Sequence, residues 1–371
     1  MVVRAPGPAE TVLQAESVPD PAPGPGQIVV AVEHCGVCYH DVVVRNGTLK
    51  AGVRMPVILG HEVAGRVAAV GRDVRGVAVG DRVATTQRSH VCGACRYCRT
   101  GREPLCAEMT FLGDAGLNGG YAEYLAIDAD GVVPIPDGVD GRAASIAACA
   151  VGTAYHAVVA VGAVRAGESV LVTGASGGVG LHAVQIAKAT GAVVLAASTS
   201  PGRAGALRQA GADHLVLHGR EEDFSAQVRD LTNGEGVDVV IDTVGTPVFQ
   251  PTRRSLARGG RWVMVGQLTG DFVPFNPAQF FLKGIDLLSS TSVTREELRQ
   301  CLGLIARGVV RPALDAALPL ERAAEAHVRL EAGSALGRIT LAVGQAFGGS
   351  DHPHPFPLPP AGEGDGRGVG A

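Results

Sequence analysis

The sequence lacks an excess of charge of either sign. Its 371 residues include 32 Lys and Arg against 36 Asp and Glu, which leaves a formal net charge of −4. No basic face is indicated, so nucleic acid is not an expected partner. The N-terminus, Met-Val-Val-Arg-Ala-Pro-Gly-Pro-Ala-Glu, also lacks the apolar run of a secretory signal. We therefore expect a cytoplasmic protein whose cysteines are reduced.

One stretch, residues 143–164, lacks charged side chains and is long enough to span a bilayer. It consists mostly of Ala, Val and Gly, and the polar groups of Thr153, Tyr155 and His156 interrupt it. This composition favours a buried helix, and no membrane association is expected.

The pattern of apolar runs changes along the chain and predicts two domains of an α/β protein. In the first third, Val- and Ala-rich runs at 28–32, 62–70 and 81–84 are separated by Gly and Pro, which indicates a small barrel-like β domain. From residue 169 to about 289, strand-like and helix-like segments alternate, which is typical of βαβ units and a parallel sheet.

We place the β-rich domain at 1–135 and the parallel-sheet domain at 136–294. Residues 295–346 are expected to complete the β-rich domain, because 338–343 has the pattern of a last strand returning to it. Residues 347–371 are rich in Gly and Pro and cannot bury a core, so they are expected to form a disordered tail.

Four cysteines in one short loop have the spacing C-x2-C-x2-C-x7-C; they are Cys92, Cys95, Cys98 and Cys106. Four thiolates this close can converge on one ion with no open position, which is typical of a structural zinc. Two disulfides are the alternative, and the absence of a secretion signal disfavours them.

A Gly-rich turn, Val-Thr-Gly-Ala-Ser-Gly-Gly-Val-Gly, follows a strand-like run at 169–173 and precedes a helix-like run at 181–189. Without side chains in the way, the pyrophosphate of a dinucleotide can approach the first amides of such a helix. The alternative is an ordinary Gly-rich turn. The predicted cofactor contacts are Gly174, Gly177, Gly178, Val179 and Gly180.

The second strand of this unit lacks the terminal Asp or Glu that would bind a ribose 2′-hydroxyl. It ends in hydroxyl groups and an Arg: Ser198, Thr199, Ser200 and Arg203. Such groups suit a 2′-phosphate through charge-assisted hydrogen bonds, so we expect NADP(H) rather than NAD(H). Alternatively, Arg203 is a solvated residue at a helix start.

Several motifs together resemble those of one enzyme family. They are Gly-His-Glu-x2-Gly-x5-Gly from residue 60, Gly-Val-Cys-x2-Asp from residue 36, the four-Cys loop, the Gly-rich turn and Asp-Thr-Val-Gly from residue 242. The chain from residue 22 to 343 thus resembles the zinc alcohol dehydrogenases of the medium-chain dehydrogenase/reductase superfamily. This resemblance implies a GroES-like catalytic domain, a Rossmann cofactor domain, a small-molecule substrate and a homodimer or homotetramer.

The resemblance also implies a second, catalytic zinc held by Cys38, His61 and Cys149, with the fourth position open. It places Glu62 behind the metal and Asp41 as the partner that orients the ring of His61. The expected reaction is hydride transfer between a nicotinamide cofactor and an alcohol, aldehyde or ketone. Three further residues have separate expectations: Thr153 contacts the nicotinamide, and Cys35 and Cys301 match no ligand position and act as small buried apolar residues.

One position departs from the family pattern. Two residues after the first zinc Cys the family often has a hydroxyl that relays the substrate proton, and here that residue is His40. His40 is expected either to relay the proton itself or only to pack beside the metal. The Cys-Tyr-x-Asp segment at residue 38 and the helix after the Gly-rich turn also resemble acryloyl-CoA reductases of the same superfamily, which reduce an activated C=C with NADPH. A zinc-stabilised scaffold without turnover is a third reading, which the full ligand set disfavours.

Overall fold

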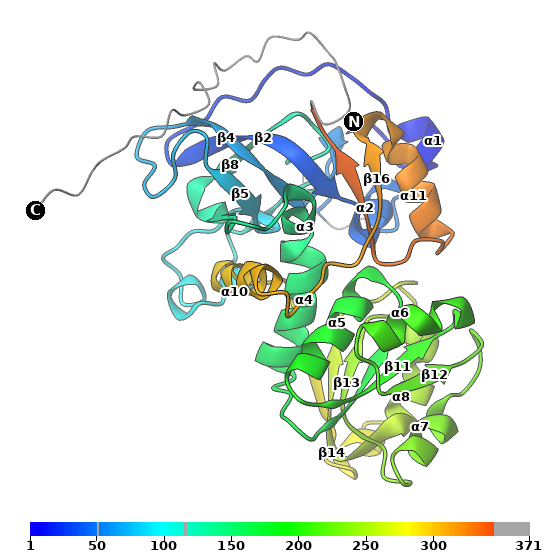
Figure 1. Cartoon of the computed structure of the whole chain (residues 1–371). Coiled ribbons are helices and arrows are strands. Elements are labelled where there is room, and N and C mark those ends of the chain that lie inside the picture. The colour runs from blue at the N-terminus through cyan, green and yellow to red at the C-terminus, as the bar shows by residue number, and fades with distance from the viewer. Residues whose placement is uncertain (50–51, 115–116, 345–371) are drawn as a thin grey trace, which may run out of the picture.

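Two β-sheets organise the chain, one in each of the two lobes seen in Figure 1. The computed structural model describes residues 1–49, 52–114 and 117–344. The domain limits given above stay predictions, and the tail predicted at 347–371 lies outside the described residues.

The sheet of the lower lobe has six strands, all parallel. In spatial order they are β12 (His214–Leu217), β11 (Val193–Ser198), β10 (Ser169–Thr173), β13 (Val237–Asp242), β14 (Leu256–Met264) and β15 (Asp286–Ser289). The order reverses between β10 and β13, which is where ligands bind in open sheets of this type.

Alternate residues of β10 face two different cores. Val170 and Val172 pack with the cluster that includes Val184, whereas Leu171 packs with the cluster that includes Val228 on the other face. Helices therefore cover both faces, which confirms the parallel sheet expected for a Rossmann cofactor domain and makes it a doubly wound sheet. They are α5 (Gly178–Ala189), α6 (Ala204–Gln209), α7 (Ser225–Leu231), α8 (Phe249–Ser255) and α9 (Ala278–Phe281).

The sheet of the upper lobe is mixed and contains strands from both ends of the described chain. Its strands are β16 (Leu314–Pro319), β17 (Arg338–Ala342), β2 (Gln27–Gly36), β4 (Val63–Val70), β5 (Arg82–Thr85), β9 (Val132–Pro134) and β8 (Tyr124–Asp128), which pairs with β2. Leu341 of β17 lies opposite Cys35 of β2 in an antiparallel pair, so the strand predicted at 338–343 does return to the first sheet.

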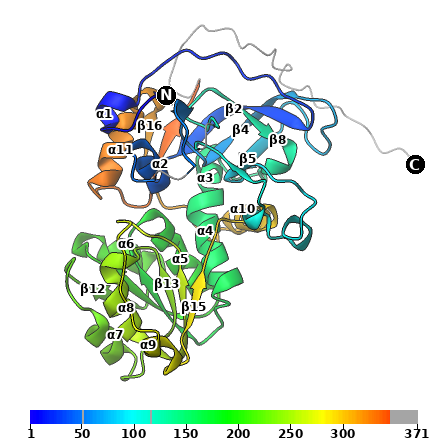
Figure 2. The ribbon, with the colours of Figure 1, turned by 180° about the vertical axis from the view of Figure 1, so that it is seen from behind.

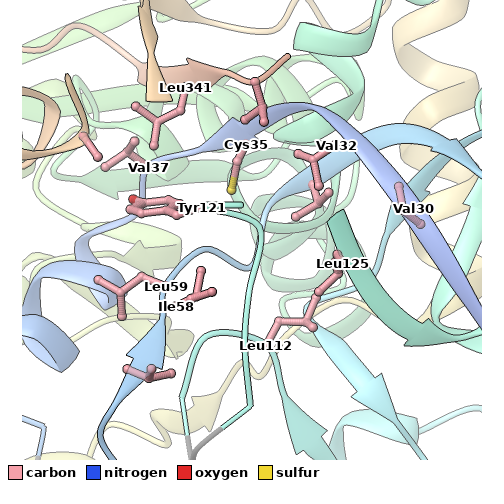
Figure 3. Close-up of a cluster of buried hydrophobic side chains, with 14 of the residues drawn as sticks. Val30, Val32, Cys35, Val37, Ile58, Leu59, Leu112, Tyr121, Leu125 and Leu341 are labelled. Atoms are coloured by element: carbon pink, nitrogen blue, oxygen red, sulfur yellow. The ribbon is translucent and has the colours of Figure 1, made fainter. Parts of the chain in front are cut away.

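Smaller elements complete this lobe. Two short strand pairs are β1 (Val2–Val3) with β3 (Val57–Ile58), and β6 (Arg88–His90) with β7 (Thr110–Phe111). The helices are α1 (Ala9–Val12), α2 (Tyr39–Arg45) and α11 (Ala323–Glu331). Figure 3 shows part of the apolar core of this lobe, in which Cys35 and Tyr121 lie among Val, Leu and Ile side chains.

The uncharged stretch at 143–164 forms a broken helical segment between the lobes, beside α10 (Arg295–Ala306) (Figure 2). Its parts are α3 (Gly141–Ser145), the π-helix η4 (Ala147–Val151), α4 (Gly152–Tyr155) and the π-helix η5 (His156–Val161). π-helical turns often occur at functional sites. Within the described residues, no helix is both long enough and apolar enough to cross a membrane.

Candidate metal centres and cofactor cleft

The four-Cys loop lies between β6 and β7 and brings its four thiols together. Their sulfur atoms all lie within 4.8 Å of one another, and all four cysteines are free of disulfides. Backbone N–H groups of the loop donate to these sulfurs: Cys95 to Cys92 at 3.3 Å, Cys98 to Cys95 at 3.5 Å and Cys92 to Cys106 at 3.5 Å. Hydrogen bonds of this kind stabilise thiolates, and four thiolates so close require a cation. The donor set therefore fits a closed zinc site.

A second group of possible metal ligands comes from three distant parts of the chain. Cys38 follows β2, His61 and Glu62 precede β4, and Cys149 lies in the π-helix η4; their ligand atoms all lie within 4.8 Å of one another. Cys38 Sγ and Cys149 Sγ are 3.8 Å apart. His61, Glu62 and Cys149 are buried.

This second group fits a metal ion because one of its buried nitrogens lacks a protein partner. His61 Nε2 makes no hydrogen bond within the described part of the chain. The hydrogen bond between the sulfur atoms of Cys38 and Cys149 lowers the pKa of the Cys38 thiol and raises the pKa of the Cys149 thiol. A thiolate beside an unpartnered imidazole nitrogen is the donor chemistry of Zn²⁺, and Glu62 adds a fourth possible donor.

Small residues allow the backbone to bring these ligands together. A Cβ added at Gly36 would lie 2.1 Å from Glu62 Oε2, so a larger residue would displace that carboxylate. Gly60 has a φ of +100°, a conformation that glycine adopts readily, and it sets the chain direction just before His61.

Asp41 supports His61 from behind. Asp41 Oδ1 lies 3.2 Å from His61 Nδ1, which leaves Nε2 facing the two thiols. The backbone N–H of Cys38 donates to Asp41 Oδ2 at 2.9 Å. Burial opposes ionisation of Asp41, but the neighbouring His61 charge outweighs it and lowers the pKa of this carboxyl. A ligating histidine commonly has such a carboxylate partner.

Arg338 is a site residue that sequence reasoning missed. Its Nη2 lies 2.8 Å from Glu62 Oε1 and donates to Cys149 Sγ at 3.4 Å. Burial raises the pKa of Glu62 to about 7, although the positive charge of Arg338 opposes this. The signal available in the sequence was a single Arg at the start of the apolar run 338–343.

Arg338 also reaches the Gly-rich turn. A Cβ added at Gly178 would lie 3.2 Å from Arg338 Nη1, and Gly177 forms a backbone bridge with Gly337. The second metal centre and the turn predicted to bind the dinucleotide are therefore neighbours across the two lobes.

His40 lies at the edge of the second centre. Its ring makes an edge contact with the ring of His61 at 5.3 Å and a tilted contact with Phe111 at 5.0 Å. His40 Nε2 is 3.4 Å from Asp114 Oδ2, and 31% of the side chain is exposed. This position, partly open to solvent and beside a ligand, suits either a proton relay or simple packing.

The Gly-rich turn connects β10 to α5, as predicted, although α5 begins at Gly178 rather than at residue 181. No side chain caps the amino end of α5, so its first N–H groups are available to an anion. A Cβ added at Gly180 would lie 2.2 Å from Gly174 O, and a side chain there would push the helix away from the strand. The turn lies where the strand order reverses, and this arrangement fits a pyrophosphate.

The hydroxyl and Arg residues after β11 lie beside this turn. The hydroxyl of buried Ser198 is 3.0 Å from that of Ser176 and accepts a hydrogen bond from Ser200 N at 3.1 Å. The guanidinium of Arg203 donates to Ser176 O at 3.5 Å and to Gly333 O at 2.6 Å, so it links the two lobes.

Two other predicted contact residues come from different segments. Thr199 directly follows Ser198 and is exposed, whereas Thr153 is half-buried on α4, four residues after Cys149. Cys35 and Cys301 are buried in apolar clusters, as expected.

Comparison with known proteins identifies both parts of the chain. Residues 24–137 match the model "Alcohol dehydrogenase GroES-like domain", and residues 178–307 match the model "Zinc-binding dehydrogenase". An acryloyl-coenzyme A reductase of Sulfurisphaera tokodaii is 33% identical, over 90% of this chain and 97% of the relative. The crystal structure of AibC is 43% identical, with a TM-score of 0.86 over 93% of this chain and 95% of that one. A crystal structure of an NAD-dependent alcohol dehydrogenase is 34% identical, with a TM-score of 0.85 over 92% and 99% of the two chains.

Proposed function

Because this chain belongs to the zinc alcohol dehydrogenase family of the medium-chain dehydrogenase/reductase superfamily and is an oxidoreductase of that type, we propose that it transfers a hydride between NADP(H) and an alcohol, aldehyde or ketone. The observation that carries this proposal is the convergence of Cys38, His61 and Cys149, next to a Gly-rich turn suited to a dinucleotide.

In this proposal Cys38, His61 and Cys149 hold the catalytic zinc. When bound, zinc acts as a Lewis acid on a substrate oxygen, and the nicotinamide supplies or accepts the hydride. Asp41 holds His61 so that Nε2 faces the metal position. Arg338 holds Glu62 at 2.8 Å and limits its approach to that position, which keeps a place for substrate.

His40 is the residue best placed to reach a substrate proton from the solvent side. Its Nε2 is within 3.4 Å of Asp114 Oδ2, and its ring contacts that of His61. We propose that a proton leaves or enters through His40, in place of the hydroxyl common in the family.

The preference for NADP(H) is supported by the absence of a carboxylate after β11 and by the presence of Ser198, Ser200 and Arg203 there. The guanidinium of Arg203 lies within reach of the Gly-rich turn, where it could pair with a 2′-phosphate. One structural relative is described as NAD-dependent, so the cofactor preference needs its own test.

A second candidate is reduction of an activated C=C, such as that of acryloyl-CoA. His40 in place of a hydroxyl relay and the 33% identity to an acryloyl-CoA reductase support it. In that reaction the hydride goes to the β-carbon, and the thioester carbonyl takes the charge.

We also propose a homodimer or homotetramer in the cytoplasm. β15 is an edge strand of the parallel sheet, and the preceding segment exposes apolar side chains, among them Phe272, Phe281 and Leu282, at 99%, 69% and 69%. Such an apolar surface favours association. Light scattering after size exclusion should give a mass of two or four chains, and a monomer would contradict the proposal.

A substrate panel tests the proposed reaction. Purified enzyme is assayed with NADPH and NADH, following absorbance of the reduced cofactor, against aldehydes, ketones and enoyl-CoA thioesters, and in reverse against alcohols. The proposal expects turnover of carbonyl compounds with a higher kcat/KM for NADPH. Turnover of acryloyl-CoA without any carbonyl or alcohol turnover would replace it with the second candidate.

A further inference from the structure

A chain of buried polar groups continues behind Asp41, away from the metal position. The hydroxyl of Tyr121 donates to Asp41 Oδ2 at 3.3 Å, and His327 Nε2 lies 3.1 Å from the same hydroxyl. Asp41, Tyr121 and His327 are 1%, 0% and 0% exposed. Tyr121 lies in the apolar core of the upper lobe (Figure 3), and His327 comes from α11, near the end of the described chain.

The direction of the hydrogen bonds follows from the chemistry of the three groups. An ionised carboxylate only accepts, so the single proton of Tyr121 goes to Asp41. The Tyr121 oxygen must then accept from His327, which carries its proton on Nε2. Burial lowers the pKa of His327 to about 4, so this ring is neutral under ordinary assay conditions.

The bonds around Asp41 restrain it on both oxygens. Asp41 Oδ2 accepts from Tyr121 and from Cys38 N–H, while Oδ1 accepts from Gly60 N–H at 3.3 Å and lies beside His61. A carboxylate restrained on both oxygens holds its histidine partner in one orientation.

Tyr121 acts in a second way through its ring. A Cβ added at Gly60 would lie 2.5 Å from Tyr121 Cδ1, so the ring packs directly against the residue that precedes His61. The hydroxyl and the ring therefore restrain the same ligand by different routes, and only the hydroxyl is lost in Tyr121→Phe.

We propose that Tyr121 and His327 are positioning residues for the second metal centre: they hold Asp41, and through it His61, in the geometry that binds the metal. The proposal rests on the metal centre of the proposed function. Because His327 lies on α11, the second metal centre then depends on the C-terminal part of the described chain.

The test uses the full chain loaded with zinc and, in parallel, with Co²⁺ at the second centre. We measure the rate of metal release to a chelator and the visible absorption of the cobalt form, neither of which requires turnover. Tyr121→Phe is expected to release the metal of the second centre faster and to shift the cobalt bands. Loss of a direct partner of a ligating histidine typically costs about 10- to 100-fold. Tyr121 acts through that partner, Asp41, so the expected change lies at the lower end of this range, about 10-fold.

Further variants separate positioning from general packing. His327→Leu should change both readouts in the same direction, and His327→Gln, which can place an amide N–H near the lost Nε2–H, should restore them in part. Tyr155→Phe is the matched control, because it removes a hydroxyl bonded to Gln300 in an exposed pair.

Two results would overturn the proposal. If Tyr121→Phe and His327→Leu keep the wild-type release rate and cobalt spectrum, even with reduced stability, the polar chain only satisfies buried groups. If the wild type binds one zinc per chain, the second metal centre itself is refuted and the proposed function falls with it.

Discussion

Glu62 gives the clearest link between burial and a measurable quantity. Its side chain is 0% exposed, and burial raises its pKa from the ordinary 4.5 to about 7. A folded-state pKa above the unfolded value means that the folded protein holds a proton that the unfolded chain has lost. The stabilising contribution of this group is therefore complete below about pH 4.5 and is lost as the pH rises to about 7.

The magnitude follows from the width of this interval. A tenfold change in proton affinity corresponds to about 1.4 kcal/mol, so Glu62 should make metal-free protein about 3 kcal/mol less stable at pH 8 than at pH 4.5. Glu62→Gln removes this titrating group while keeping the shape of the side chain. The variant should therefore lack that part of the pH dependence.

Urea unfolding of metal-depleted wild type and Glu62→Gln, at several pH values from 4.5 to 8, measures the effect as a difference between two curves. Other titrating groups contribute to both curves and largely cancel in the comparison. Added Zn²⁺ serves as a control, because a cation beside Glu62 favours the carboxylate and should flatten the wild-type curve. Parallel curves for the two proteins without metal would refute the reasoning.

Three other predictions concern the metals, the cofactor and the proton. Metal analysis should give two zinc ions per chain in the wild type and one in Cys149→Ala, which should also lose activity. A value near one in both proteins would contradict the second metal centre. Cys95→Ala should mainly lower the melting temperature, because zinc binding at the four-Cys loop is coupled to folding. Arg203→Ala should reduce kcat/KM for NADPH but not for NADH, by the factor that corresponds to the loss of about 1.5–3 kcal/mol from a charged hydrogen bond. Equal kcat/KM values for the two cofactors in the wild type would contradict the NADP assignment. His40→Ala should lower kcat by about 10²–10⁴-fold if the imidazole moves the proton, and an unchanged rate would leave His40 as a packing residue.

Some of the site could be predicted because its parts are neighbours in the sequence. The spacing of Cys92, Cys95, Cys98 and Cys106 was sufficient, since a loop this short brings its thiols together in nearly any fold. The Gly-rich turn was recognisable for a similar reason: Gly180 is required by its own contact with Gly174, a few residues away. The parallel sheet also followed from local alternation of strand and helix patterns.

The second metal centre could be predicted only through resemblance to a family. Cys38, His61 and Cys149 have no spacing that predicts a shared site, because their approach depends on the pairing of β2 with β4 and on a π-helix that reaches across to them. The register of that pairing and the wider turn of the π-helix depend on long-range packing, since η4 contacts α10 and also α5 of the lower lobe.

Arg338, Tyr121 and His327 were decided by the tertiary structure alone. In the sequence they are single polar residues among apolar neighbours, a pattern that does not distinguish a site residue from an ordinary buried one. The folded chain pairs β17 with β2 and packs α11 against α2, which brings Arg338 to Glu62 and His327 to Tyr121. A buried polar group needs a hydrogen-bond or charge partner. The sequence by itself determined that the side chains of Arg338, Tyr121 and His327 needed such partners. Long-range packing determined which partner each side chain found.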